Sequence, residues 1–445
     1  MESELEGLKE LIERADYQRL REKVKAIHPH DLAELLEQLK PEERNRTLVN
    51  LEHAVVIDLL PELPEEMQLE YVKVLPPKQA AELLASVPPD DMTDVLGDLS
   101  LETRRKIVDY FTKEKTKEAR DLLKHREDTA GGLMTTQVMA LPSDLTCAEA
   151  EDNIRDKAKE YETVYYIYVL EGQKLVGVLS LRELVLADPT TKLRDAMSPE
   201  VIKVLPSLDQ EEVARIIADY DLLAIPVVDP KDRLLGIVTV DDVIDVIDEE
   251  TTEDLAHFSG TPVQMDKLID APIFTVVKAR LPWLLVTLVG GLLAGTIIGL
   301  FKETIATIIT LAVFIPIIMD MGGNVGAQSS TIFIRGIATK EVGDIMDYFL
   351  REIKIGILMG LATGIGVGIA AFLWQKTLML GVVVGAAMFF AVSVASTMGV
   401  LAPTLFTHLK LDPAITAGPL ITTATDITGL IIYFSLATML LHYLV

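Results

Sequence analysis

Residues 281–301 read LPWLLVTLVGGLLAGTIIGLF, a stretch of 21 residues without one charged side chain. At a rise of about 1.5 Å per residue, a helix of this length crosses a hydrocarbon core of about 30 Å. Four more apolar segments follow, and together they carry only two acidic residues, Asp320 and Asp426. The sequence therefore predicts a membrane domain with five spans, at 281–301, 304–334, 355–375, 377–407 and 413–441.

The first 270 residues have a different composition, rich in charged side chains. Net charge over the whole chain is −26, from 41 basic and 67 acidic residues, which argues against nucleic-acid binding and favours cations as partners. Cys147 is the single cysteine, so an internal disulfide and a cysteine-based metal site are both excluded. The opening MESELEGLKELIERAD lacks an apolar core and is not a signal peptide, so we expect this region in the cytosol.

Basic residues beside the spans predict the orientation in the membrane. One side of the membrane would carry six of these basic residues, and the other side would carry only Lys302 and Lys376. The positive-inside rule then places the N-terminus inside and the C-terminus outside a multi-pass protein of the inner or plasma membrane. The larger set comprises Lys278, Arg280, Arg335, Lys340, Arg351 and Lys354.

Three features of the membrane domain indicate a path for a hard cation. Asp426 lies near the middle of the fifth predicted span, where a carboxylate costs at least about 2.5 kcal/mol unless it faces a cavity, an ion or a partner. The stretch 321–328, MGGNVGAQ, suggests broken or closely packed backbone, or else a wide turn at the cytosolic end of the second span. Prolines could free carbonyl oxygens, which suit such a cation, at Pro316, Pro403, Pro413 and Pro419.

Glycines recur at every fourth position in two spans. One ridge comprises Gly291, Gly295 and Gly299, and the other comprises Gly356, Gly360, Gly364 and Gly368. Such ridges allow helix backbones to approach closely. Packing within one subunit and contact between two subunits both explain them.

An internal duplication occupies residues 135–250. Apolar runs at 164–170 and 224–229 precede the similar segments LVGVLS (175–180) and LGIVT (235–239), and the openings 138–144 and 204–209 also correspond. This pattern resembles a tandem pair of CBS domains, whose usual ligands are adenine nucleotides. By that resemblance Thr239 and Asp242 are candidate nucleotide contacts, although Asp242 could instead bind a metal. The first copy has Glu183 where the second has Asp242.

Residues 1–130 predict a helical array. The units DLAELL (31–36) and QAAELL (79–84) are close copies, and Leu-Pro pairs separate the helices. Acidic residues gather elsewhere, with eight carboxylates and no basic residue between Asp241 and Asp254. Like charges four residues apart destabilise a helix, so we expect this run to resist helix formation unless cations neutralise it.

The order of these parts resembles the MgtE family of magnesium channels. The most specific segments are GGNVG (322–326), QSST (328–331) with RGIA (335–338), and 419–429 around Asp426. The resemblance implies a homodimer with the pore on its axis, lined near Asn324 and Gly326, and an ion bound by Asp426. Ala327 stands where relatives often have a polar residue, which implies looser selectivity.

The same resemblance implies regulatory Mg²⁺ between the cytosolic parts. Carboxylates at the matching positions are Asp58, Asp90, Asp94, Glu211, Asp221, Asp242, Asp245, Glu250, Glu253, Asp254 and Asp412, with Asp91 as an extra ligand. At high internal Mg²⁺ these ions would hold a compact state in which the connecting helix closes the pore. Because no P-loop motif occurs, flux would run down the electrochemical gradient.

The expected fold class is a multidomain membrane protein, and the expected function is gated Mg²⁺ uptake without enzymatic activity. Transport of Co²⁺ or Mn²⁺, a membrane-anchored nucleotide-sensing receptor, a CBS-gated anion channel and, least favoured, an enzyme remain alternatives. Its parts are an all-α array at 1–130, an α/β CBS pair at 131–200 and 201–250, an acidic connecting helix at 251–270 and an all-α five-helix transmembrane domain at 271–445.

Overall fold

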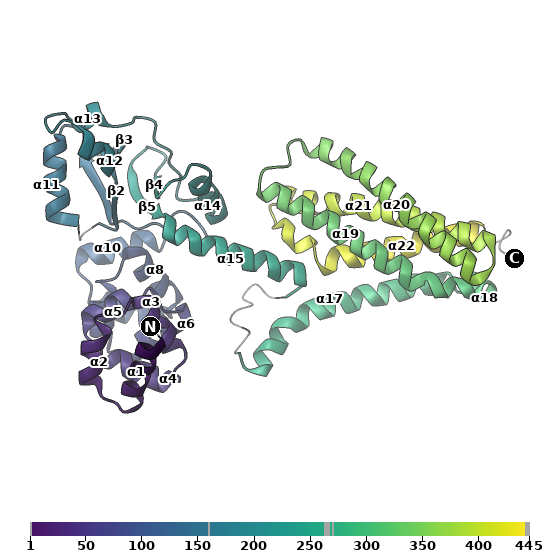
Figure 1. Ribbon diagram of the computed structural model, residues 1–445, viewed down its shortest axis with the longest axis horizontal. Helices are drawn as coiled ribbons and strands as arrows, with labels where there is room; N and C mark the ends of the chain where they lie inside the picture. Colours follow the sequence, from purple (N-terminus) through teal and green to yellow (C-terminus); the bar gives the residue numbers. More distant parts are fainter. Residues whose placement is uncertain (1, 159–160, 262–267, 269–270, 441–445) are drawn as a thin grey trace. The chain divides into compact units, whose positions relative to one another are not determined.

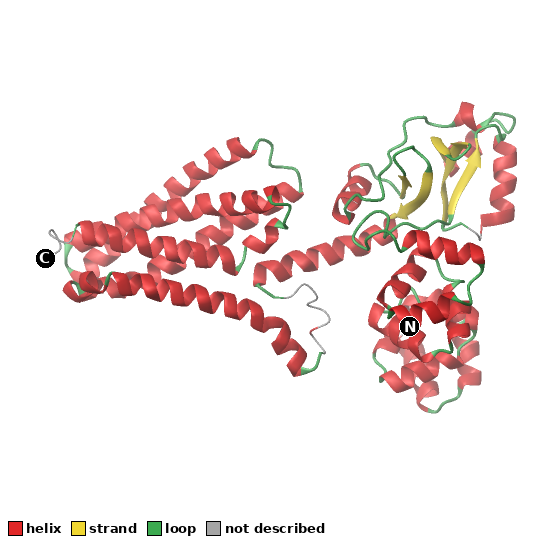
Figure 2. Cartoon of the chain, turned by 180° about the vertical axis from the view of Figure 1, so that it is seen from behind, coloured by secondary structure: helices red, strands yellow, loops and turns green. Residues whose placement is uncertain are grey.

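The computed structural model describes residues 2–158, 161–261, 268 and 271–440 (Figure 1). The chain divides into two compact units, Met1–Ile247 and Asp248–Val445, each of which is described by itself. Strands lie only in the first unit among the described residues, and the long apolar helices lie in the second (Figure 2). Leu441, at the predicted end of the fifth span, lies outside the described residues, as do positions 262–267 and 269–270 of the predicted connecting helix.

The first part of the first unit is helical, as predicted. Pro29, Pro41, Pro77 and Pro89 stand in first turns, where the missing N–H would have no helical acceptor. The helices are α1 (Glu2–Glu13), α2 (Tyr17–Val24), α3 (Pro29–Glu37), α4 (Pro41–Asn50), α5 (His53–Leu59), α6 (Glu65–Val74), α7 (Pro77–Leu84), α8 (Pro89–Asp98), α9 (Leu101–Val108) and α10 (Lys113–Leu122).

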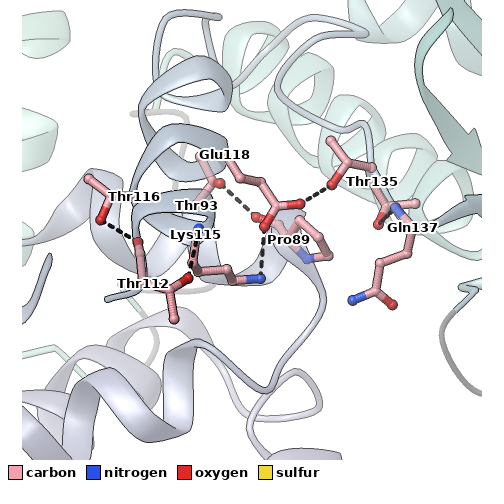
Figure 3. A network of polar contacts seen from close by, with 9 residues as sticks. Pro89, Thr93, Thr112, Lys115, Thr116, Glu118, Thr135 and Gln137 are labelled. Carbon is pink, nitrogen blue, oxygen red and sulfur yellow. Dashed lines mark hydrogen bonds and ion pairs between the residues drawn. The ribbon is translucent and has the colours of Figure 1, made fainter. Parts of the chain in front are cut away.

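The two matched sequence units fall on equivalent helices of this array. Leu35 and Leu36 of α3 and Leu83 and Leu84 of α7 are all buried in one apolar core. Full burial of each leucine stabilises the array by about 1.5–3 kcal/mol. At the end of the array Glu118 of α10 pairs with Lys115 at 3.1 Å (Figure 3). Glu118 also accepts a hydrogen bond from the hydroxyl of Thr136 in the next domain.

The predicted duplication forms two small sheets. In the first, β1 (Val138–Pro142) pairs in parallel with β2 (Thr163–Glu171), which pairs antiparallel with β3 (Lys174–Ser180). In the second, β4 (Ala224–Val228) and β5 (Leu234–Thr239) are antiparallel. The counterpart of β1 in the second copy is reduced to one bridge, Val204 to Val227, since Pro206 offers no N–H to continue the pairing. The helices are α11 (Cys147–Lys157), α12 (Leu181–Leu186), α13 (Leu193–Ala196) and α14 (Gln210–Asp219).

The acidic run is helical, which differs from the expectation that it resists helix formation without cations. It lies on α15 (Val240–Ser259), which begins earlier than the predicted connecting helix. Val243 and Val246, three residues apart, are buried in the core of the second CBS copy, and Ala256 is buried near the other end. Apolar packing at these positions offsets the repulsion among the exposed carboxylates.

The described part of the second unit contains five helices long and apolar enough to cross a membrane, as predicted. They span Ile273–Leu300, Ile309–Ala338, Ile345–Gln375, Leu378–His408 and Pro419–Met439. The second of them combines a short 3₁₀ turn with α19. In chain order the elements are α17 (Ile273–Leu300), α18 (Lys302–Thr307), η2 (Ile309–Phe314), α19 (Ile315–Ala338), α20 (Ile345–Gln375), α21 (Leu378–His408), η3 (Pro413–Thr416) and α22 (Pro419–Met439).

The two glycine ridges have different surroundings. In α20 the ridge packs against α21, because a Cβ on Gly360 or Gly364 would lie 2.6 Å from the carbonyl oxygen of Phe389 or Gly385. Packing within one subunit therefore explains this ridge. In α17, a Cβ on any of the three ridge glycines would meet no described atom within 4 Å, so that ridge is open in the single chain.

Two backbone expectations for the membrane domain are wrong. Residues 321–328 lie inside continuous α19, neither broken nor at a turn, and only their close packing was anticipated correctly. Pro316, Pro413 and Pro419 stand in the first turns of their helices, where proline frees no carbonyl. Pro403 is inside α21, where it does leave one carbonyl without its helical donor.

Candidate functional site: an acidic cavity in the membrane unit

Asp426 lies on α22 beside the glycines of α19. A Cβ on Gly323 would lie 3.0 Å from Thr422 Cγ2 and 3.6 Å from a carboxylate oxygen of Asp426. Asp426 follows Pro419 by seven residues, about 10 Å along the helix. It is thus nearer the start of the span than expected, because η3 and the break at Gly418 occupy the beginning of the predicted segment. Glycine at position 323 therefore lets α19 pack closely against Thr422, one turn before Asp426 on α22.

A cavity of about 450 Å³ opens beside Asp426. Thr422 and Thr423 of α22, Ala327 and Met319 of α19, and Gly290 of α17 contribute to its wall. A carboxylate and hydroxyls supply oxygen ligands, and none of the described residues of the wall is a cysteine or histidine. The residues at this site therefore fit a hard cation, either bare or hydrated.

One face of α19 carries an exposed polar stripe at membrane depth. Asp320, Asn324 and Gln328 follow each other at intervals of four residues and are all exposed in the single chain. Asp320 also interacts electrostatically with Asp426. Gly326, by contrast, is buried, and its Cβ would lie 2.9 Å from Thr425 Cγ2, so in the single chain this glycine packs closely against α22. Sequence reasoning singled out Asn324 but missed the four-residue spacing that joins it to Asp320 and Gln328.

The end of α15 packs on the start of α22 and borders the cavity. Phe258 and Ser259 contribute to the cavity wall. A Cβ on Gly418 would lie 2.8 Å from the carbonyl oxygens of both His257 and Phe258, so a larger side chain would not fit without movement. Gly260 has a φ of 64°, a conformation that favours glycine, and its Cβ would meet Pro419 Cγ at 2.6 Å. The two glycines let these backbones meet at the mouth of the cavity.

A buried carboxylate links three helices next to the polar stripe. Glu352 of α20 is only 5% exposed, and the hydroxyls of Ser329 on α19 and Ser396 on α21 both donate to its Oε1 at 2.6 Å. Ser329 follows Gln328 directly, so this network fixes the rotation of α19 about its axis. This network was not predictable from the sequence, because Glu352 lies in the charged stretch between the second and third predicted spans.

Replacing Glu352 by alanine is expected to destabilise the membrane unit by about 1–3 kcal/mol, because two buried hydroxyls lose their acceptor. Glu352→Gln keeps a carbonyl oxygen and should cost less. Thermal unfolding of the full chain in detergent measures the effect, with Asp347→Ala as the control at an exposed carboxylate of the same helix. Equal melting temperatures for Glu352→Ala and the control would contradict this account of the network.

A second acidic group lies within the first unit. It joins Asp90, Asp91 and Asp94 of α8 with Asp242 at the start of α15 and with Glu162 before β2. Asp90 Oδ1 is buried and has no hydrogen-bond partner among the described residues. We call these five residues the α8 cluster.

Burial and mutual repulsion raise the pKa values throughout the α8 cluster. Burial, followed by the charge of Asp242, raises the pKa of Asp91 to about 7, and that of Asp242 rises to about 6 mainly through burial. The pKa of Asp94 also rises to about 7, although this residue is more exposed and better screened. Burial raises the pKa of Asp90 and of Glu162 as well. Uncompensated charge here is therefore unfavourable, and carboxylates so arranged fit a divalent cation.

Without divalent cations, stability of the first unit should fall as pH rises from 6 to 8. The pKa of Asp91 is about 7 against an ordinary value of 3.8, so in this range the folded chain binds more protons than the unfolded chain and loses stability as they dissociate. Thermal unfolding of the full chain in EDTA tests this, and Asp91→Asn should show a smaller difference. A melting temperature that rises with pH equally in both proteins would contradict it.

The other predicted metal ligands fall into three groups. Asp245 interacts electrostatically with Asp242, while Glu253, Asp254 and Asp412 lie together in the second unit. Asp58 on α5, Glu211 at the start of α14 and Asp221 after α14 have exposed side chains, and Glu250 is half-buried on α15.

The candidate nucleotide residues lie together where β5 ends and α15 begins. Thr239 is buried at the end of β5, and its hydroxyl donates to Asp242 of α15 at 2.5 Å. An apolar pocket of about 690 Å³ lies beside the first copy, where Tyr165, Tyr166, Ser180 and Arg182 line it. The adjacent tyrosines and the arginine after Ser180 were the sequence signal for this pocket, and it was missed.

Comparison with known proteins follows the same division of the chain. The family model for the MgtE intracellular N domain matches residues 27–128, that for the CBS domain matches 130–189 and 193–249, and that for MgtE, a divalent cation transporter, matches 315–436. The magnesium transporter MgtE of Thermus thermophilus is 39% identical over 443 residues, 98% of each chain. The chain belongs to the MgtE family of magnesium transporters.

Other MgtE relatives agree. The magnesium transporter MgtE of Bacillus subtilis is 34% identical over 421 residues, 94% of this chain and 93% of that one. A crystal structure of the soluble part of a magnesium transporter is 35% identical with a TM-score of 0.53, and covers 56% of this chain and 99% of that one. The cytosolic domain of an MgtE channel in complex with ATP is 41% identical with a TM-score of 0.52, covering 54% and 99%.

Membership of the MgtE family confirms several predictions from the sequence. The family, the fold class, magnesium transport and the location in a membrane are as expected, and the chain is a transporter and not an enzyme. The reading as an anchored nucleotide receptor without transport is thereby rejected.

Proposed function

We propose that the chain is a Mg²⁺ channel whose path runs along the polar stripe of α19 and past Asp426. The observation that carries this is the half-buried Asp426 on the wall of a cavity, beside a helix face that exposes Asp320, Asn324 and Gln328 at membrane depth. Lipid cannot satisfy such polar groups, so water or a second chain must cover them. Flux would run down the electrochemical gradient.

Mg²⁺ as cargo fits the chemistry of this wall. It prefers oxygen ligands and gives up water reluctantly, so Asp426 would attract a partly hydrated ion through water. Ala327 lines the cavity with a methyl group and cannot donate a hydrogen bond to that hydration shell. We therefore propose looser discrimination against Co²⁺ and Mn²⁺ than a polar residue at this position would give.

A homodimer would complete the wall of the conduction path. The polar stripe of α19 and the glycine ridge of α17 are both open in the single chain. A second copy that covered the stripe would bring two Asp426 carboxylates to a shared axis, which would double the attraction for a divalent ion.

Intracellular Mg²⁺ would act as the regulator through the acidic groups. Candidate ligands in the α8 cluster are Asp90, Asp91, Asp94 and Asp242, with Asp245 beside them and Asp58, Glu211, Asp221 and Glu250 as further carboxylates. Bound Mg²⁺ would neutralise repulsion and favour the compact arrangement, in which the end of α15 stays at the mouth of the cavity. When Mg²⁺ falls, the repelling carboxylates would separate and α15 would withdraw.

An adenine nucleotide is proposed as a second regulator, supported by the relative whose cytosolic domain was solved with ATP. The pocket lined by Tyr165, Tyr166, Ser180 and Arg182 offers aromatic faces for a base and a guanidinium for phosphate. Thr239 and Asp242 remain candidate contacts by resemblance, although the carboxylates around Asp242 would repel the phosphates.

The proposed orientation has the first unit in the cytosol and the C-terminus outside. Lys278 and Arg280 near the start of α17 and Arg335 near the end of α19 would then face the cytosol, as the positive-inside rule requires.

A substitution in the polar stripe tests the conduction path. Asn324→Leu should lower Mg²⁺ flux into liposomes at least about tenfold, because an apolar side chain in the pore removes groups that hold water beside the ion. Ile332→Leu, another exposed position of α19, is the matched control and should conduct normally. Equal flux through both variants would remove the stripe from the path.

A further inference from the structure

Three metal-binding side chains converge where α15 meets the loop before η3. Glu253, His257 and Asp412 each offer one ligand atom, and these atoms lie within 4.8 Å of one another. His257 Nε2 is 3.3 Å from Glu253 Oε1 and 3.3 Å from Asp412 Oδ2. The resemblance predicted the two carboxylates as Mg²⁺ ligands but included no histidine, so the nitrogen changes the chemistry of the site.

Local structure holds the three side chains in place. Glu253 and His257 are four residues apart and share one face of α15. Asp412 Oδ1 accepts a hydrogen bond from the backbone N–H of Ala414 at 2.8 Å, which leaves Oδ2 directed to the imidazole. The backbone at His257 is fixed by its close approach to Gly418. Contacts within the chain therefore hold the three side chains together.

A purely structural explanation of His257 is incomplete. The residue is only 9% exposed, and its Nδ1 is buried without a hydrogen-bond partner among the described residues. A histidine that serves packing alone normally satisfies its ring nitrogens. Here the ring instead directs Nε2 to two carboxylates, at a position where the charge of Asp254 also acts. Local charge is negative, which suits a divalent cation.

We propose that Glu253, His257 and Asp412 bind a late first-row divalent cation such as Co²⁺ or Zn²⁺, and that this ion fastens the end of α15 at the mouth of the Asp426 cavity. Imidazole favours Co²⁺, Ni²⁺ and Zn²⁺ over Mg²⁺, which prefers oxygen ligands alone. The effect on the path rests on the proposed gating by α15. The site would let such ions close a pore whose own oxygen-lined wall discriminates poorly against them.

Co²⁺ binding tests the site directly, because nitrogen ligation is visible in the ligand-field absorption of bound Co²⁺. The full chain in detergent, freed of metals with a chelator, should bind Co²⁺ with a spectrum that excess Mg²⁺ does not abolish. His257→Gln should weaken this binding at least about tenfold, the least loss expected for a perturbed metal site. His53→Gln, at an exposed histidine of α5, is the matched control and should bind as the wild type does.

Identical Co²⁺ spectra and affinities for the wild type and His257→Gln, or no Co²⁺ binding at all, would overturn the proposal and leave only an ion pair at this position. Flux in liposomes separates this failure from failure of the proposed gating. The flux of each protein is compared with its own flux at low divalent-cation concentration. On this scale, micromolar Co²⁺ on the cytosolic side should reduce flux through the wild type more than flux through His257→Gln. Closure by Mg²⁺ without any Co²⁺ binding would refute the inference alone, whereas no closure by Mg²⁺ would refute the gating.

Discussion

Asp426→Asn should reduce Mg²⁺ flux at least about 30-fold. The substitution keeps the size of the side chain and removes the charge that attracts the cation to the cavity. Removing one partner of a desolvated charge interaction costs about 2–5 kcal/mol, and 1.4 kcal/mol corresponds to a factor of ten. Uptake of Mg²⁺ into liposomes measures the loss. The amide keeps its shape and hydrogen bonding, so the protein should fold and elute as the wild type does.

The matched control for this prediction is Asp347→Asn, at an exposed carboxylate in the first turn of α20. It should leave flux unchanged, and Asp320→Asn should give an intermediate loss because its charge acts on Asp426 from α19. Full flux through Asp426→Asn would show that the ion does not pass this carboxylate, and the cavity would then have another purpose.

Neutralising the α8 cluster should make flux nearly indifferent to cytosolic Mg²⁺. In Asp90→Asn/Asp91→Asn/Asp94→Asn, both the repulsion that Mg²⁺ relieves and the ligands that bind it are removed. In the wild type, a coupling free energy of about 1.4 kcal/mol would make the flux at low cytosolic Mg²⁺ at least about tenfold larger than the flux at high Mg²⁺. In the triple variant we expect this ratio to fall towards one. In EDTA the variant should be more stable than the wild type, because burial and neighbouring charges raise the pKa values of all three carboxylates.

Glu42→Gln/Glu43→Gln is the control for that variant, since both residues are exposed on α4. It should retain the response to Mg²⁺ and the stability of the wild type. A triple variant that still closes at the same Mg²⁺ concentration would exclude the α8 cluster as the sensor.

Much of the architecture was predictable because it follows from composition and spacing. Five long apolar runs predict five spans, and the repeated LVGVLS and LGIVT segments predict paired sheets. The leucines of the copied units on α3 and α7 were expected to be buried, since the hydrophobic period and the helix propensity of these units both predict helices with one apolar face. That Asp426 belongs to the candidate site in the membrane unit was predictable from the free-energy cost of placing a carboxylate within the membrane.

The parts that the sequence could not reveal depend on contacts between distant residues. Glu352 resembles a loop residue until the folded chain places Ser329 and Ser396 against it. His257 resembles a solvated helix residue, because Asp412 is far away along the chain. The acidic run forms a helix because its two valines have a core to enter, and local charge repulsion says nothing of that core.

The most direct test of a Mg²⁺ pore closed by Mg²⁺ is the current through the purified protein in a planar bilayer, with free Mg²⁺ raised only on the side of the first unit. We expect a Mg²⁺ current at micromolar concentrations on that side, which falls at least about tenfold as millimolar Mg²⁺ is reached. A current that is unaffected by Mg²⁺ on that side would contradict the gating. The absence of any divalent current from folded protein would contradict the pore itself.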